Sequence, residues 1–266
     1  MVFSGLTFLL LFLPALLILY YLSRDLRWRN GVLVVFSLVF YAWGEPVMVL
    51  LLIGTTLFNY IIARVMDRVE SAGARKLCLV LGVLGSLAGL VYFKYAGFFL
   101  STLESLFGFR LGFDGPRLPI GISFYTFQIL TYTVDVYRGK VPVQRSFTRL
   151  LLYVSCFPQL IAGPIVQYAD VAAALDQRTT STDDFIDGMS RFFLGLGKKV
   201  LLANTCGSFL LSVLPAGTAP QSVAGAWLSA FLYSLQLYYD FSAYSDMAIG
   251  LGRVLGFTYK ENFIYP

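Results

Sequence analysis

Histidine is absent from all 266 residues of the sequence, and charged residues make up only 13% of it. Without an imidazole, the chain has no side chain whose unperturbed pKa lies near neutrality, so no mechanism that it runs by itself uses an imidazole base. Soluble domains hold roughly 25% charged residues. Hydrophobic residues supply 58% of this chain, and glycine adds 24 residues. A soluble globule cannot hide that much apolar surface, so the composition indicates a polytopic membrane protein.

Cysteine is also scarce, and its spacing excludes two kinds of site. Cys78, Cys156 and Cys206 lie in or beside apolar segments. An odd number without paired spacing predicts neither a disulfide framework nor a zinc site. No other metal-ligand pattern occurs in the sequence, so we expect buried structural cysteines, no metal and no bound cofactor.

Basic residues outnumber acidic ones, 20 to 15, without forming a basic face. They lie in short clusters between apolar runs, which is the pattern of loops that flank membrane spans. No basic helix or aromatic-basic motif indicates nucleic-acid binding, so the expected partner is the lipid bilayer. The first residues lack a basic cluster, so we expect the first apolar run to remain as a span rather than to be a cleaved signal peptide.

The chain is divided by apolar runs close in length to the roughly 20 residues needed to cross a bilayer. The run 150–166 is broken by Pro158 and by Gly163-Pro164, which fits a re-entrant segment, or two half-spans, buried in protein. The fold class is therefore all-α: a polytopic transmembrane helical bundle with a re-entrant segment. Other runs predict spans at 5–22, 31–43, 47–63, 77–92 and 118–136, a polar connection at 101–117, a short amphipathic helix at 192–202 and a run too long for one span at 223–257.

The basic clusters orient the chain. Loops 23–30, 64–76 and 138–149 are rich in Lys and Arg, so we expect them on the cytoplasmic side and the N-terminus on the other. Lys198 and Lys199 are expected on the cytoplasmic side for the same reason.

Two carboxylates interrupt the last apolar run. Asp240 and Asp246 fall about 120° apart around a helix, so a paired-carboxylate mechanism is not favoured. Tyr239, Ser242 and Asp246 fall within about 60° of one another and can line a polar channel. The alternative is that the two acids form structural pairs with basic residues, for which Arg253 and Lys260 are the candidates.

A second polar group lies in the span at 118–136. Ser123, Thr126 and Gln128 place polar atoms at membrane depth. They either line a polar path or hydrogen-bond between helices, and the sequence leaves both interpretations open.

Five segments occur in an order that resembles one protein family. The sequence is similar to the membrane-bound O-acyltransferase (MBOAT) family, and within it to the branch of alginate O-acetyltransferase membrane subunits. The likeness extends over essentially the whole chain. The segments are residues 118–128 (LPIGISFYTFQ), 137–140 (YRGK), 157–168 (FPQLIAGPIVQY), 238–250 (YYDFSAYSDMAIG) and 262–266 (NFIYP).

The resemblance implies that residues 1–266 are one transmembrane domain, the N-terminal portion of a partial MBOAT fold. Family members continue into a segment that contains the catalytic histidine. No catalytic residue is therefore assigned here, and the resemblance implies that this portion is inactive alone. The residues expected to line the substrate tunnel are Gln128, Tyr239, Asp240, Ser242, Tyr244 and Asp246. Those expected to form a donor funnel, unless they only fix topology, are Lys140, Arg145, Arg149, Lys198 and Lys199.

The implied reaction takes place in the plasma (inner) membrane. An acyl group, such as acetyl, passes from a cytoplasmic donor to hydroxyls of an extracytoplasmic polysaccharide, directly or through a partner acetyltransferase. The donor is acetyl-CoA, another acyl thioester or an acyl carrier protein. Two alternatives are a non-catalytic membrane scaffold or remnant and a small-molecule transporter; the lack of a repeat between the halves counts against transport.

Overall fold

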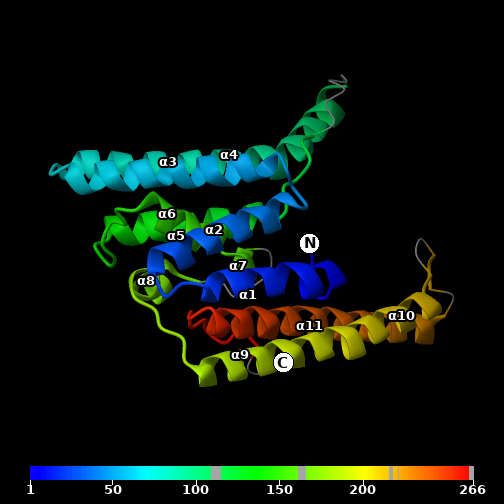
Figure 1. Cartoon of the computed structure of the whole chain (residues 1–266). Helices are drawn as coiled ribbons and strands as arrows, with labels where there is room; N and C mark the ends of the chain where they lie inside the picture. The colour runs from blue at the N-terminus through cyan, green and yellow to red at the C-terminus, as the bar shows by residue number, and fades with distance from the viewer. Residues whose placement is uncertain (109–114, 161–165, 216–217, 221, 264–266) are drawn as a thin grey trace.

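The computed structural model describes residues 1–108, 115–160, 166–215, 218–220 and 222–263. Every regular element in these parts is helical, as the composition predicts. The chain is layered in Figure 1, with α3 and α4 on one side, α2, α5 and α6 next, then α1, and α9 to α11 on the far side. The all-α fold is confirmed for the described residues.

The N-terminal apolar run forms η1 (Phe8–Phe12) and α1 (Leu13–Tyr21), which continue one another as a helix. After a short turn, α2 (Leu26–Ala42) begins at Asp25, whose carboxylate accepts a hydrogen bond from the Arg27 backbone N–H. This cap satisfies one of the N–H groups that a helix start leaves without an intrahelical partner.

Two long apolar helices, α3 (Met48–Arg68) and α4 (Ala72–Phe107), have the length and composition of membrane spans. They pack against α5 (Ile122–Tyr137). The polar connection expected at 101–117 is wrong for its first part, because α4 continues to Phe107 and ends at Gly108 in the left-handed conformation, φ 71°. Apolar residues recur up to that glycine, so nothing ends the helix earlier.

The run 150–166 has flanks that lie close together. It forms α6 (Phe147–Ser155) and α7 (Phe157–Leu160), and α8 (Tyr168–Asp176) follows. The two flanks meet, because Gln144 Nε2 donates to Tyr168 Oη at 3.0 Å. Between them, Phe157 packs at 5.5 Å, centroid to centroid, from both Phe12 and Phe40. The contact between the two flanks fits a re-entrant segment, which stays a prediction, and Gly163-Pro164 lies outside the described residues.

The short amphipathic helix expected at 192–202 is wrong. The elements α9 (Thr182–Gly197), η2 (Lys198–Ala203) and α10 (Asn204–Val213) form one continuous helical segment. No proline interrupts it, and a capping box of Ser181 and Asp184 fixes its start. It runs beside α11 (Val223–Val254), and this pair makes the most extensive helix contact of the described structure (Figure 1).

The three basic loops meet at one end of the bundle, as their charge predicts. One pocket there is lined by Met66 and Arg75 together with residues 139–143. Another joins Arg27 to residues 144–146 and 148–149. These loops therefore share one side of the molecule.

Candidate functional site

Glycines let the two longest helical segments of the C-terminal part touch backbone to backbone. A Cβ on Gly195 of α9 would lie 2.7 Å from the carbonyl oxygen of Ala243 on α11. A Cβ on Gly250 of α11 would lie 2.5 Å from the carbonyl oxygen of Gly188. Such distances are closer than any real Cβ tolerates, so only glycine permits this approach. The close approach brings charged side chains of the two segments together.

Two carboxylates of α11 pair with cations from α9 and η2. Lys199 Nζ lies 2.7 Å from Asp240 Oδ1, and Lys198 Nζ lies 2.5 Å from Asp246 Oδ2. Arg191 Nη2 approaches the other oxygen of Asp246 at 2.9 Å. Asp246 is the more protected acid, since 17% of its side chain is exposed against 42% for Asp240.

Both acids therefore form ion pairs with basic residues, but the partners expected from the sequence, Arg253 and Lys260, are wrong. Arg253 bonds Asp184 and Asp187 at the start of α9, and Lys260 bonds Asp170 of α8. Arg253, in the last turn of α11, reaches acids at the start of α9, and Lys260, beyond the end of α11, reaches α8, so neither pairs with Asp240 or Asp246.

The sequence analysis did not identify Arg191, which lies at the centre of this cluster of charged residues. Its guanidinium also holds both oxygens of Glu261 at 2.5 Å, a bidentate pair that ties the segment after α11 to α9. The hydrogen bonds from Arg191 lower the pKa of the Glu261 carboxyl. A usable signal existed, since Arg191 and Lys198 are seven residues apart and therefore share a helix face.

Only some of the tunnel candidates share a cavity. A largely apolar pocket of about 340 Å³ is lined by Lys199, Asp240 and Tyr244, with Phe3 among the other lining residues. The ring of Tyr244 stacks on Phe3 at 4.7 Å between centroids. Tyr239 and Ser242 are not in this lining, and Ser242 Oγ donates to the Tyr239 carbonyl within the helix at 3.4 Å.

Gln128 lies apart from the α11 candidates. It is buried on α5, where its Nε2 donates to the Tyr153 carbonyl of α6 at 3.4 Å. The Tyr153 hydroxyl donates in return to the Gln128 carbonyl at 3.3 Å. Of the two interpretations left open by the sequence, the structure supports the hydrogen bond between helices.

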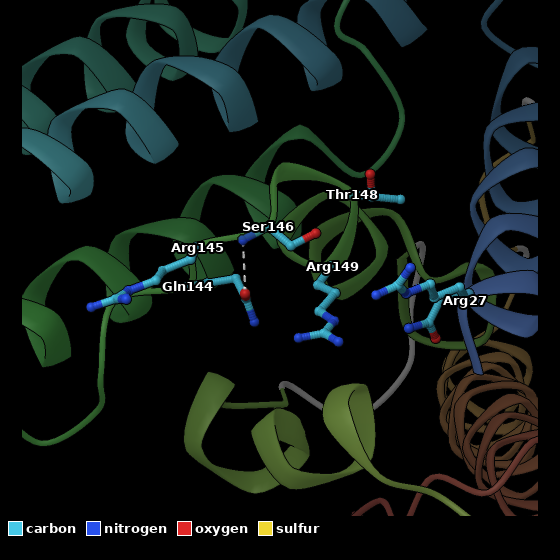
Figure 2. A pocket seen from close by; sticks show the side chains of 7 residues that line it. Arg27, Gln144, Arg145, Ser146, Thr148 and Arg149 are labelled. Atoms are coloured by element: carbon cyan, nitrogen blue, oxygen red, sulfur yellow. Dashed lines mark hydrogen bonds between the residues drawn. The ribbon is translucent and has the colours of Figure 1, made fainter. Parts of the chain in front are cut away.

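The residues expected to form the donor funnel also lie in separate places. Arg145 and Arg149 line a pocket of about 480 Å³ at the basic end, which Figure 2 shows from close by. Lys140 lies in a neighbouring pocket and is 3.7 Å from Asp135. Lys198 and Lys199 lie further along the helical segment of α9 to α10. At a rise of 1.5 Å per residue, Lys198 is about 24 Å from the start of that segment at Thr182. The two lysines line neither of these two pockets, and their part in a donor funnel stays a prediction.

Arg27 joins Arg145 and Arg149 in the pocket, although the sequence interpretation gave it only a topological role. In Figure 2, Arg27 from α2 extends toward Arg149 of α6, whose guanidinium points toward the helix drawn below it, while Arg145 extends to the other side of Gln144. Sequence spacing gave no signal for this meeting, because Arg27 and Arg149 are 122 positions apart and only the packing of α2 against α6 brings them together.

Comparison with known proteins now decides the family. The profile of MBOAT, the membrane-bound O-acyltransferase family, matches residues 78–266. The chain belongs to this family. Its MBOAT relatives include the probable alginate O-acetylase AlgI of Pseudomonas aeruginosa, which is 43% identical over 274 residues. That alignment covers 100% of this chain and 52% of the relative.

Two further MBOAT relatives extend the comparison. The probable alginate O-acetylase AlgI of Pseudomonas putida is 44% identical over all of this chain and 55% of its own length. The peptidoglycan O-acetyltransferase of Helicobacter pylori is 31% identical, covering 88% of this chain and 49% of that protein. The chain spans about half the length of these curated relatives. Family and fold agree that it is a membrane protein.

Proposed function

We propose that this chain is the N-terminal part of a membrane O-acyltransferase that modifies an extracytoplasmic polysaccharide, of the alginate type or another surface glycan. Identity of 43% along the whole chain to an alginate O-acetylase is the observation on which the proposal rests. The peptidoglycan relative supports the broader class, O-acylation of a glycan.

The donor side is assigned to the end where the basic loops meet. Cytoplasmic loops of inner-membrane proteins are enriched in Lys and Arg, so this end faces the cytoplasm and the N-terminus lies outside. An acyl thioester, either acetyl-CoA or an acyl carrier protein, is anionic and would be attracted to Lys140, Arg145 and Arg149. The α9–α11 pair, with Asp240 and Tyr244 at its cavity, would contribute a wall of the path between donor and acceptor.

The test is deletion of the gene that encodes this chain, followed by complementation with the native gene. Ester-linked acetate on the purified surface polysaccharide is then measured by NMR. We expect acetylation to fall on deletion and to return on complementation. Unchanged acylation of every surface glycan in the deletion strain would refute the proposal.

A non-catalytic scaffold is the second candidate, and the absence of histidine favours it. Purified 266-residue protein, incubated with labelled acetyl-CoA and polysaccharide, separates the two. Transfer by the purified chain would refute the scaffold. Complementation in cells without transfer by the purified chain is the result expected if the catalytic histidine lies outside residues 1–266.

A further inference from the structure

The pocket of about 480 Å³ at the basic end has the composition of an anion site. Three arginines, Arg27, Arg145 and Arg149, line it together with the amides of Asn30 and Gln144 and the hydroxyls of two further residues, Ser146 and Thr148. Guanidinium groups bind phosphate oxygens through paired hydrogen bonds, so this lining suits a phosphate better than a carboxylate or an apolar group.

The backbone adds a second source of positive potential. The helix α6 begins at Phe147, inside this lining, and Ser146 at its N-cap makes no side-chain hydrogen bond to the first turn. Its first N–H groups have no intrahelical acceptor and carry the positive end of the helix dipole. By contrast, the α2 start is already capped by Asp25. An anion in the pocket would therefore meet donors from α6 as well as from the arginines.

A buried amide points to the rest of the ligand. Asn30 lines the pocket, is only 4% exposed, and donates through Nδ2 to the Leu175 carbonyl at 3.2 Å. Its Oδ1 is buried and has no hydrogen-bond partner among the described residues. A buried acceptor without a partner is costly, and an O–H or N–H of a ligand would satisfy it.

Carboxylates around the pocket compensate only one of its arginines. Asp176 of α8 pairs with Arg149. Within the described residues, Arg27 and Arg145 form no ion pair, and both side chains are exposed. Positive charge therefore remains in the pocket for a ligand to neutralise.

We propose that this pocket binds a phosphate ester that carries a hydroxyl or amide N–H close to the phosphate. The arginines and the α6 N-terminus hold the phosphate, and Asn30 Oδ1 accepts from the neighbouring donor. Two sources present this chemistry on the cytoplasmic side: the phosphopantetheine of a soluble acyl donor and the headgroup of phosphatidylglycerol. Only the assignment to the acyl donor rests on the proposed function.

Binding is measured directly on the intact purified protein, without acyl transfer, so a failure here is distinct from a failure of the acylation experiment. One arm titrates 4′-phosphopantetheine into detergent-solubilised protein. The other reconstitutes the protein into phosphatidylcholine nanodiscs with or without phosphatidylglycerol, and counts retained lipid by native mass spectrometry.

Three substitutions and one control define the site. We expect Arg27→Gln and Arg149→Gln each to weaken binding about tenfold, the loss typical of one charge-assisted contact. Arg68→Gln removes an exposed charge from the same end, outside the pocket lining, and should leave the Kd within twofold. Asp176→Asn breaks the pair with Arg149 while keeping the guanidinium, so binding should be equal or tighter. Size-exclusion profiles and thermal melts verify that each variant is folded.

The outcomes distinguish a soluble acyl donor from a lipid headgroup as the source of the phosphate ester. Saturable binding of phosphopantetheine that depends on Arg27 and Arg149 supports the site and assigns it to a soluble donor. Retention of phosphatidylglycerol with the same dependence, without phosphopantetheine binding, supports the site and assigns it to lipid. Binding of neither probe, or equal weakening by Arg68→Gln, overturns the proposal.

Discussion

Lys198 Nζ lies 2.5 Å from Asp246 Oδ2, although the two residues belong to different helical segments and are 48 positions apart. Arg191 holds the other oxygen of the same carboxylate. One acid thus joins two cations where the two helical segments meet. Partly buried charged groups are costly unless paired, so the geometry of this helix pair depends on Asp246.

Replacement of Asp246 by alanine should destabilise the protein strongly. The substitution leaves Arg191 and Lys198 without their shared carboxylate, which is only 17% exposed, so we expect a loss of about 1–3 kcal/mol. Asp240→Ala is the matched control, because that acid has one cation partner and is 42% exposed. Thermal melting in detergent should show a much larger loss for Asp246→Ala. Equal losses would contradict the unequal burial of the two acids.

The double variant Asp246→Asn with Lys198→Met should recover part of the stability lost by Asp246→Asn alone. Removing the lysine charge removes one of the uncompensated cations, so the two effects should not add. A double-mutant cycle on melting temperatures measures the coupling. Additive losses would mean that the 2.5 Å pair contributes no coupling energy in the membrane protein.

The glycines of the α9–α11 contact should tolerate no side chain. Gly250→Ala places a Cβ 2.5 Å from a backbone carbonyl oxygen and must separate the helices. Gly197→Ala is the control on the same helical segment, because nothing lies within 4 Å of its Cβ position. Alanine favours helix by up to about 1 kcal/mol over glycine, so the control should be neutral or stabilising. We expect low membrane abundance for Gly250→Ala only; normal abundance would refute the close contact.

The Glu261–Arg191 pair should make stability depend on acid pH. Because Arg191 lowers the pKa of Glu261 in the folded protein, the pair stabilises the fold above the unfolded pKa of about 4.5. That contribution is lost as the pH falls through the lower folded pKa. Melting temperatures of wild type and Glu261→Gln should therefore differ at pH 7 and converge progressively as the pH falls below the unfolded pKa. A constant difference across that range would show that Glu261 acts through packing instead.

The common end of the basic loops gives a topological prediction. Cysteine introduced at Ser71, in the exposed turn between α3 and α4, should react with a membrane-impermeant maleimide only after the cells are opened. The parent protein, with its own three cysteines, gives the background. Labelling of intact cells at Ser71 would reverse the proposed orientation.

The sequence by itself determined the membrane class and the helical character of the early apolar runs, because apolar run length is a local property. It also determined that the basic loops share one end, because Lys and Arg cluster after every second apolar run. Local patterns could not place Lys198 and Lys199. An amphipathic segment looks short until it is known that the helix continues from Thr182 to Val213.

Tertiary structure decided which charges meet. Asp246 pairs with Arg191 and Lys198 rather than with Arg253, which is nearer in sequence, because glycines let α9 lie directly against α11. Arg27 meets Arg149 because α2 packs on α6. Periodicity reports the face of a helix on which a side chain lies. Which helix covers that face depends on long-range packing, and only the folded chain supplies it.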